Sequence, residues 1–265
     1  MVLDEILRSQ RRQVEAQKKT ISLQLLQKRV AKFKRKIYSL TETLTKPSKK
    51  PRLICEMKKA SPSEGLIRRE FNPVKILSEF KLGGADAISI LTERKFFGGD
   101  PRYIKMIRSK THKPILRKDF IIDDYQIYES KLMGADAILL IISILKPNEL
   151  QNLSQLATYL GLEVLVEIHN EAELEIALKN NARLIGVNNR NLSTLQVNVA
   201  HATKMIQAIP RNIVKIVESG IESREDIERY KGLSVNGFLV GASLMRSRNI
   251  AEKIKTLKGL YNGTR

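Results

Sequence analysis

Hydrophobic residues gather in short continuous runs along the chain after residue 52. Eight of these runs have the length and apolar character of buried parallel strands, and they cover residues 53–57, 87–92, 114–118, 137–142, 163–168, 184–188, 213–218 and 237–240. Between them, apolar residues recur at helical spacing. The pattern therefore predicts strands and helices that alternate from residue 53 onward.

Turn and capping residues mark the ends of the expected helices. Asn72-Pro73 and Asp100-Pro101 each pair an N-cap residue with a proline at the first helical position. Further N-cap candidates are Asp123, Asn170, Asn198 and Ser223, and the expected helix ends are at Gly83-Gly84, Gly134, Gly161 and Gly232.

The number of strands selects the fold class. Eight strands that alternate with helices, at roughly 20 to 35 residues per unit, predict an α/β protein with a (β/α)₈ TIM barrel, which typically needs about 250 residues. A faint internal repeat supports this, because residues 82–90 and 132–140 both begin Leu-x-Gly-Ala-Asp-Ala-Ile, with the same spacing. A doubly wound open sheet would explain the alternation, but not the count of eight.

Residues 1–47 form a separate region ahead of the first strand. Apolar residues recur there at helical spacing, at Leu3, Ile6, Leu7, Leu25, Leu26, Val30, Phe33 and Ile37. Lysine and arginine fill the other faces, and 46–51 breaks the pattern with two prolines. We expect a helical extension of one single-domain chain, 1–265, packed near the barrel mouth.

Charge and composition limit the classes of function. The formal net charge is +19, and residues 1–52 hold 15 Lys/Arg against 4 Asp/Glu, which suits nucleic acid, an anionic membrane surface or an anionic small substrate. The chain has no recognised nucleic-acid module and no Trp. No apolar run resembles a membrane span or a secretion signal, and Cys55 is the only cysteine. We expect a cytoplasmic monomer without specific nucleic-acid or membrane partners.

The first strand shows where the chemistry lies. Alternation puts Ile54, Glu56 and Lys58 on one face and Leu53, Cys55 and Met57 on the other. Polar residues also end the later strands, at Glu93, Lys118, Asp119, Glu167, Asn188, Arg190, Glu218, Ser219 and Gly241. In a barrel these strand ends meet at one mouth. Several carboxylates and two lysines would converge there and shift one another's protonation.

The last two strand ends suit a phosphate group. Residues 218–221 (Glu-Ser-Gly-Ile) and 240–243 (Val-Gly-Ala-Ser) contain small residues, and we expect them to expose backbone N–H groups. Loops after strands seven and eight of such barrels frequently bind phosphate. Gly220 and Gly241 are therefore candidates for a phosphate site.

Seven motifs together resemble the indole-3-glycerol-phosphate synthases. They are 56–63 (EMKKASPS), 91–97 (LTERKFF), 114–120 (PILRKDF), 165–168 (LVEI), 186–192 (GVNNRNL), 218–221 (ESGI) and 239–245 (LVGASLM), and the likeness runs essentially end to end. It implies a tryptophan-biosynthesis enzyme that acts on 1-(2-carboxyphenylamino)-1-deoxyribulose 5-phosphate. The product would be indole-3-glycerol phosphate, with loss of carbon dioxide and water and with neither cofactor nor metal.

The resemblance also implies a role for each site residue. Lys118 or Lys58 would supply the proton for ring closure, and Glu167 would transfer a proton in the dehydration. Glu56 would hold a lysine or stabilise positive charge on nitrogen. Asn188 and Arg190, with Glu218 and Ser219 nearby, would hold the anthranilate end. Phe97 and Phe120 would form apolar walls, and the phosphate would lie against Ser61, Gly220, Gly241 and Ala242, with Lys58.

Two departures and one rival complete the picture. Ala242 stands where relatives often carry Ser or Glu, and Asn191 replaces an Asp of some members. Phosphoribosylanthranilate isomerase, another phosphate-binding barrel, would use a cysteine and an aspartate, but the two lysines would then be unexplained. We expect Cys55 to be a buried, inert thiol. The three histidines show no metal-binding spacing, and we expect each to lie near a loop or helix surface.

Overall fold

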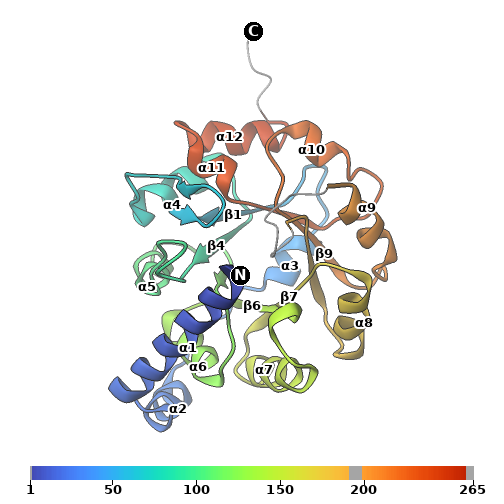
Figure 1. The fold of residues 1–265 in the computed structure, drawn as a ribbon. Coiled ribbons are helices and arrows are strands. Elements are labelled where there is room, and N and C mark those ends of the chain that lie inside the picture. The colour runs from blue at the N-terminus through green and yellow to red at the C-terminus, as the bar shows by residue number, and fades with distance from the viewer. Residues whose placement is uncertain (1, 191–198, 261–265) are drawn as a thin grey trace.

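Eight parallel strands close into a barrel that is ringed by helices (Figure 1). The computed structural model describes residues 2–190 and 199–260. Around the barrel the strand order is β1-β10-β9-β8-β7-β6-β5-β4, closed by pairing of β4 with β1. The strands are β1 (Leu53–Met57), β4 (Ala87–Leu91), β5 (Ile115–Lys118), β6 (Ala137–Ile141), β7 (Glu163–Ile168), β8 (Leu184–Asn188), β9 (Val214–Glu218) and β10 (Gly237–Val240). The predicted fold class is confirmed.

The hydrophobic runs located the strands to within one residue. β1, β7, β8 and β10 have the predicted bounds, and the other four lose one residue at one end. A two-residue hairpin, β2 (Ala60–Ser61) with β3 (Gly65–Leu66), was not predicted. It lies in the loop after β1, where Pro62 prevents a longer ladder.

Helices follow the strands in sequence. They are α4 (Pro73–Gly83), α5 (Arg102–Arg108), α6 (Asp124–Met133), α7 (Pro147–Tyr159), α8 (Glu171–Lys179), α9 (Val199–Ala208), α10 (Arg224–Glu228), α11 (Ala242–Arg246) and α12 (Ile250–Leu257), with a 3₁₀ turn, η1 (Ile142–Ile144), after β6.

Several helix ends were predicted correctly. The side chains of Asn72, Asp123 and Asn170 accept backbone N–H bonds as N-caps. Gly84 and Gly134 end α4 and α6 in the left-handed conformation that glycine adopts without strain. The Asp100 prediction was wrong by one residue, because Pro101 is the N-cap of α5. The predicted cap at Asn198 lies outside the described residues.

Strand alternation separates two buried cores. Leu53, Cys55 and Met57 point outward and pack with the helices. Ile54 points inward and packs in the barrel interior with Leu116, Leu139, Leu165, Ile216 and Leu239. The facing predicted for β1 is therefore confirmed, and Glu56 and Lys58 belong to the inward series.

The extension contains three helices, α1 (Val2–Thr20), α2 (Leu23–Lys32) and α3 (Leu40–Thr45). Val14 of α1 and Leu26 of α2 pack on Tyr125 of α6. The start of α1 crosses the mouth of the barrel in Figure 1, where Leu3 and Ile6 join the interior core. This part of the extension lies where the sequence predicted it.

The third helix lies at the opposite end of the barrel. Leu40 and Leu44 of α3 are buried among residues that begin the strands, such as Ala87 and Leu184. The carboxylate of Glu163, the first residue of β7, accepts hydrogen bonds from Ser39 Oγ and from the first N–H groups of α3. Our expectation that the whole extension lies near the mouth was therefore wrong, because α3 closes the amino end.

The expected helical pattern through Phe33 and Ile37 was also wrong. Residues 33–39 form neither helix nor strand between α2 and α3, and the backbone is extended at both ends of the segment, at Phe33 and Ser39. Arg35 Nη2 donates to the Ala135 carbonyl at 2.8 Å and Tyr38 N–H donates to Asp136 Oδ1 at 3.0 Å. These bonds to the loop before β6 provide a partner for the backbone N–H of Tyr38 and fix the segment that leads to α3 at the amino end of the barrel.

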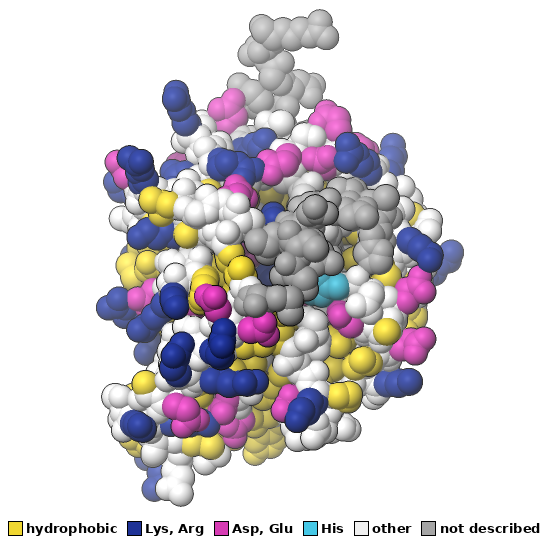
Figure 2. All heavy atoms as spheres, viewed as in Figure 1, with side chains coloured by type: hydrophobic (Ala, Val, Ile, Leu, Met, Phe, Trp, Pro, Cys, Tyr) yellow, Lys and Arg dark blue, Asp and Glu magenta, His cyan; other side chains and the backbone are white. Residues whose placement is uncertain are grey.

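Charged side chains cover the outside. Figure 2 shows lysines and arginines interspersed with acidic side chains over the described part of the mouth face. Within the described part of the chain, each helix is too short or too polar to span a lipid bilayer.

Candidate active site

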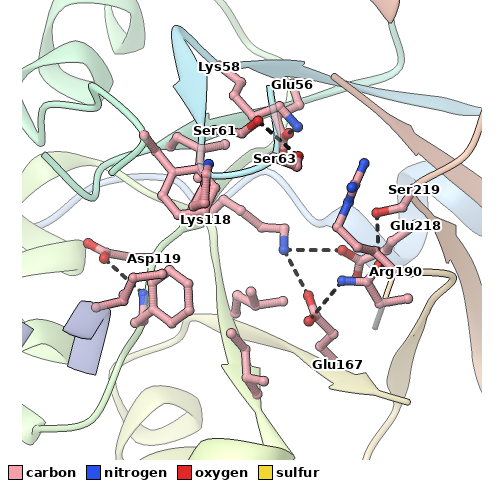
Figure 3. A pocket seen from close by; sticks show the side chains of 18 of the residues that line it. Glu56, Lys58, Ser61, Ser63, Lys118, Asp119, Glu167, Arg190, Glu218 and Ser219 are labelled. Carbon is pink, nitrogen blue, oxygen red and sulfur yellow. Dashed lines mark hydrogen bonds and ion pairs between the residues drawn. The ribbon is translucent and has the colours of Figure 1, made fainter. Parts of the chain in front are cut away.

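A cavity opens at the carboxyl ends of the strands (Figure 3). Eleven of the fourteen predicted site residues line it: Glu56, Lys58, Ser61, Phe97, Lys118, Phe120, Glu167, Asn188, Arg190, Glu218 and Ser219. The other three, Gly220, Gly241 and Ala242, line an adjoining pocket that shares Glu56, Lys58, Arg190 and Ser219.

Lys118 lies at the centre of the charged part of the cavity. Its Nζ is 2.8 Å from Glu167 Oε2 and 3.2 Å from Glu218 Oε2, as the dashed lines in Figure 3 show. Burial alone would lower the pKa of Lys118, but Glu167, Glu218 and Glu56 outweigh it and raise the pKa above the ordinary lysine value. The side chain is therefore an ammonium ion at neutral pH.

The two carboxylates beside Lys118 have opposite protonation behaviour. Burial disfavours the charged form of Glu167, yet the Lys118 charge, with His169 and Asn188, lowers its pKa to about 2. Burial raises the pKa of Glu218 to about 7, and the charge of Glu167 adds to this effect while Lys118 opposes it. One group is a carboxylate and the other is poised to hold a proton near neutral pH, a separation typical of acid–base chemistry.

Asn188 joins three strand ends. Its Nδ2 donates to Glu167 Oε1 at 3.1 Å, and its Oδ1 accepts from Ser219 Oγ at 2.8 Å and from Arg190 N–H at 3.0 Å. Ser219 and Gly220 have φ values of 67° and 76°, so both adopt the left-handed conformation. Such strain in a non-glycine residue is common at functional sites.

Two glycines make room for buried carboxylates. A Cβ at Gly186 on β8 would overlap Glu218 Oε1, and a Cβ at Gly241 would overlap Glu56 Oε1. The sequence singled out Gly241 for its backbone and missed Gly186. At both positions the required feature is the absence of a side chain opposite a carboxylate.

Glu56 lines the cavity together with Glu167 and Glu218. Lys58 Nζ is 3.2 Å from Glu56 Oε1, and Ser89 Oγ donates to Glu56 Oε2 at 3.4 Å. Lys58 lines both the cavity and the adjoining glycine-rich pocket, whereas Lys118 lines the cavity alone. The two lysines thus lie in different parts of the site.

Apolar side chains form the opposite wall. The rings of Phe97 and Phe120 lie 5.9 Å apart between centroids, and Leu3 and Ile6 of α1 also line the cavity. The buried carboxylate of Glu93 accepts the backbone N–H groups of residues 95, 96 and 97 at 3.0, 2.7 and 3.0 Å. Glu93 therefore fixes the loop that carries Phe97.

The adjoining pocket combines glycine backbone and small side chains with Lys58 and Arg190, and also with the side chains of Glu56, Glu64 and Glu222. Gly220 lies in the loop after β9, Gly241 lies between β10 and α11, and Ala242 is the first residue of α11. Ser243 Oγ donates to the Ile221 carbonyl at 2.9 Å and ties the two loops together. Exposed N–H groups of this kind suit an anion such as phosphate.

Comparison with known proteins identifies the family. The family model described as indole-3-glycerol phosphate synthase matches residues 3–257. The chain belongs to this family. The resemblance inferred from the seven motifs is confirmed.

Individual relatives agree with this assignment. An indole-3-glycerol phosphate synthase of Acetivibrio thermocellus is 49% identical over 78% of this chain and 80% of its own length. One of Endomicrobium trichonymphae is 44% identical over 97% of this chain and all of its own length. A solved 3-hexulose-6-phosphate synthase from Salmonella typhimurium shares the fold, with a TM-score of 0.62 at 17% identity over 79% of this chain and 97% of that one.

One prediction about the indole-3-glycerol phosphate synthase site needs correction. We expected His169 near a surface, but only 13% of its side chain is exposed, and its Nε2 is 3.4 Å from Glu167 Oε1. The position two residues after Glu167 on an inward-facing strand end was a signal that the sequence already contained.

The side chain of His201 lies outside the described residues. Among the described residues, no cluster of His, Cys, Asp and Glu is arranged to hold a metal ion.

Proposed function

We propose that the chain is a carbon–carbon lyase that converts 1-(2-carboxyphenylamino)-1-deoxyribulose 5-phosphate to indole-3-glycerol phosphate in tryptophan biosynthesis. A bond forms between the ring carbon that carries the carboxylate and the ribulose carbonyl carbon. Carbon dioxide then leaves and the aromatic ring is restored. The former carbonyl oxygen leaves as water together with a proton from the adjacent carbon, the methylene bonded to nitrogen, and the double bond formed between these two carbons completes the indole ring.

One observation carries this proposal. The ammonium group of Lys118 lies 2.8 Å from Glu167 and 3.2 Å from Glu218, in a cavity that is aromatic at one end and glycine-rich at the other. An aromatic wall lines one end and glycine backbone lines the other. The substrate has the matching polarity, with an aromatic ring at one end and a phosphate at the other. The reacting carbons lie between these groups, as the Lys118 cluster does.

Lys118 is assigned the proton donor for ring closure. Its charge stabilises the oxyanion that develops on the ribulose carbonyl, and its proton can neutralise that oxygen. Lys58 lines the glycine-rich pocket as well as the cavity. We therefore assign Lys58 to the phosphate and Glu56 to the orientation of Lys58 and to positive charge on the substrate nitrogen.

Glu167 and Glu218 are assigned the proton transfers of dehydration. Glu167 is ionised at neutral pH and can accept a proton, whereas Glu218 has a pKa of about 7 and can hold one. Asn188 fixes Glu167 through its amide, and Ser219 fixes Asn188 through its hydroxyl. These bonds hold the base in one orientation during the reaction.

The remaining residues are assigned to binding. Arg190, with Asn188, holds the substrate carboxylate, because Arg190 extends into the cavity in Figure 3 and a guanidinium pairs well with a carboxylate. Phe97 and Phe120 pack on the aromatic ring. The phosphate is held by Ser61, Lys58 and the backbone at Gly220, Gly241 and Ala242.

The working protein is proposed to be a cytoplasmic, single-domain monomer. Each assigned residue comes from this one chain, and the helical extension packs into the barrel at both ends. Size-exclusion chromatography with light scattering tests the monomer. A stable dimer at assay concentration would contradict it.

An activity assay tests the reaction itself. The purified protein, with a chelator present and no added cofactor, is mixed with the carboxyphenylamino-deoxyribulose phosphate, and indole fluorescence is followed with time. We expect turnover under these conditions. A folded sample that acts only on phosphoribosylanthranilate would favour the isomerase, although Cys55 is fully buried in the outer core, away from the cavity.

A further inference from the structure

The ring of His169 lies between two carboxylates. Its Nε2 is 3.4 Å from Glu167 Oε1 inside the cavity, and its Nδ1 is 3.3 Å from Glu173 Oε2 on α8. Glu167, His169 and Glu173 therefore form a chain that leads from the cavity to the start of α8. Neither Glu173 nor His169 lines the cavity.

Glu173 is fixed independently of the ring. Its Oε2 accepts the His169 backbone N–H at 2.7 Å, and its Oε1 accepts from Asn170 Nδ2 at 3.0 Å. In return, the Glu173 backbone N–H donates to Asn170 Oδ1 at 2.9 Å. This reciprocal capping at the start of α8 holds the outer carboxylate in place, so the ring has a fixed anion on its outer side.

The charges of the cavity explain what the ring does. Three carboxylates, Glu56, Glu167 and Glu218, face the two ammonium groups of Lys58 and Lys118. A neutral imidazole would turn one unprotonated nitrogen toward a carboxylate oxygen, because both ring nitrogens face one. An imidazolium ion places a further positive charge within ion-pair distance of both carboxylates.

The groups around Glu167 agree with a charged ring. Lys118 from β5 is at Oε2, Asn188 from β8 donates to Oε1, and Glu218 from β9 lies beyond Lys118. Burial lowers the pKa of His169, but Glu173, Glu167 and Glu218 together raise it above the ordinary value. The positive ring in turn helps to lower the pKa of Glu167.

We propose that His169, held as an imidazolium ion by Glu173, is a positioning residue that keeps the Glu167 carboxylate ionised and in one orientation. The role in turnover rests on the proposed function, whereas the ion chain itself does not. The two parts can therefore be tested separately.

The ion chain is tested without substrate. The protein contains only three histidines, so NMR titration of the imidazole signals is simple, and His169→Gln assigns the signal of interest. We expect His169 to titrate above the ordinary value of about 6.5, and to titrate at lower pH in both Glu173→Gln and Glu167→Gln. The signal of His112, whose ring bonds to Tyr38 at 2.6 Å, serves as the internal reference. A His169 signal that titrates at or below 6.5, or is unmoved in both variants, would overturn the proposal.

The kinetic role is tested with Glu173→Gln and His169→Gln. Both substitutions introduce an amide that preserves much of the shape and hydrogen bonding but removes a charge. Glu167 should then be less well oriented and less fully ionised, which should lower kcat by up to about 100-fold with little change in KM. The acid limb of the kcat profile should move to higher pH, because removal of a positive neighbour raises the pKa of Glu167.

A purely structural role predicts a different result. It would lower the melting temperature of both variants and leave kcat and the pH profile of the folded protein unchanged, which would contradict the positioning role. If the unaltered protein shows no turnover, the proposed function fails, and the NMR titration still decides whether the ion chain exists.

Discussion

Two buried clusters of cations and carboxylates lie side by side on β5, one around Arg117 and one around Lys118. Arg117 points outward into the helical layer and Lys118 points into the cavity, because neighbouring residues of a strand face opposite sides. Arg117 is fully buried. Its three nitrogens contact Thr92 Oγ1 (3.1 Å), Asp119 Oδ2 (3.0 Å), the Gln126 carbonyl (3.1 Å), Ser130 Oγ (3.0 Å) and Glu129 Oε2 (2.8 Å).

The Lys118 cluster differs in that it lines the cavity and contains a buried carboxyl group with a raised pKa. Glu218 Oε1 is buried and makes no hydrogen bond among the described residues. Glu218 also has a raised pKa, as expected for a carboxyl group whose charged form is poorly solvated. The cluster is open to the cavity, where a substrate can supply the missing partners.

The difference distinguishes a structural ion cluster from a chemical one. The Arg117 cluster lies within the packed helical layer, where its hydrogen bonds and ion pairs hold one geometry and contribute to the specificity of packing. The Lys118 cluster faces the cavity and includes Glu218, whose protonation is adjustable near neutral pH. The following variants test this contrast.

The largest expected effect is on kcat in Lys118→Met. Methionine keeps most of the volume but has no proton to give, and loss of a general acid typically costs ~10²–10⁴-fold in rate. The fold should survive, because Glu218 can take up a proton when the positive charge is removed. Steady-state kinetics with a circular dichroism check measures both. Lys215→Met is the matched control, since Lys215 is also a buried strand lysine but bonds to the Ile206 carbonyl outside the barrel. Near-normal kcat in Lys118→Met, with only a raised KM, would make Lys118 a binding residue.

Arg117→Met should instead lower the free energy of unfolding. Asp119 and Glu129 would lose their cation inside a packed layer, and breaking such a buried pair typically costs about 3–5 kcal/mol. Urea denaturation of this variant beside Lys118→Met compares the two clusters directly. Loss of less than 1 kcal/mol would show that the Arg117 cluster is not the more structural of the two.

The sequence predicted the Lys118 cluster better than the Arg117 cluster. Glu56, Lys118, Glu167 and Glu218 each end an apolar run, and parallel strands in a barrel bring those ends together. Asp119, one partner of Arg117, was noted as a strand-end residue, but no periodicity or strand position indicates the partners on α6, Gln126, Glu129 and Ser130. The fold was predictable for the same reason, because alternation and capping are local signals.

Long-range contacts account for what the sequence did not predict. Residues 33–39 do not form the helix that their apolar pattern predicts. Their bonds to Ala135 and Asp136 override the local helical preference. Gly186 matters only because Glu218 lies opposite on the next strand. His169 was assigned to the surface because its partner Glu173 belongs to a helix start.

Opposite pH dependences should distinguish Glu218 from Glu167. Glu218 has a pKa of about 7 in the folded protein against an ordinary 4.5, so the native state keeps a proton that the unfolded chain releases. Its contribution to stability is present below pH 4.5 and is lost as the pH rises toward 7, at about 1.4 kcal/mol per pKa unit. Glu167, lowered to about 2, contributes above pH 4.5 and loses that contribution as the pH falls toward 2.

The measurement is urea denaturation between pH 3 and 8 for the unaltered protein, Glu218→Gln and Glu167→Gln. Relative to the unaltered protein, Glu218→Gln should gain stability from pH 4.5 to 7, and Glu167→Gln should gain it as the pH falls below 4.5. The same dependence for both variants would mean that the two carboxyl groups are not differentiated.

The smallest expected effect concerns Gln10, through which α1 reaches the Arg117 cluster. Gln10 Nε2 donates to Asp119 Oδ1 at 3.0 Å, and both side chains are buried. Hydrogen bonds to charged groups typically contribute about 1.5–3 kcal/mol, so Gln10→Ala should lower the free energy of unfolding by that amount. The start of the same helix lines the cavity through Leu3 and Ile6.

Gln10→Ala should therefore also raise KM while kcat stays nearly unchanged, because it loosens one apolar wall and leaves the Lys118 cluster intact. Gln17→Ala is the matched control two turns along α1, where Gln17 Nε2 donates to the partly exposed Glu129 at 3.0 Å. It should cost less stability and leave KM unchanged, since that part of α1 packs on α6 away from the cavity. A drop in kcat for Gln10→Ala comparable to that of Lys118→Met would mean that the two clusters on β5 act as one unit, and the division between structural and chemical pairing would fail.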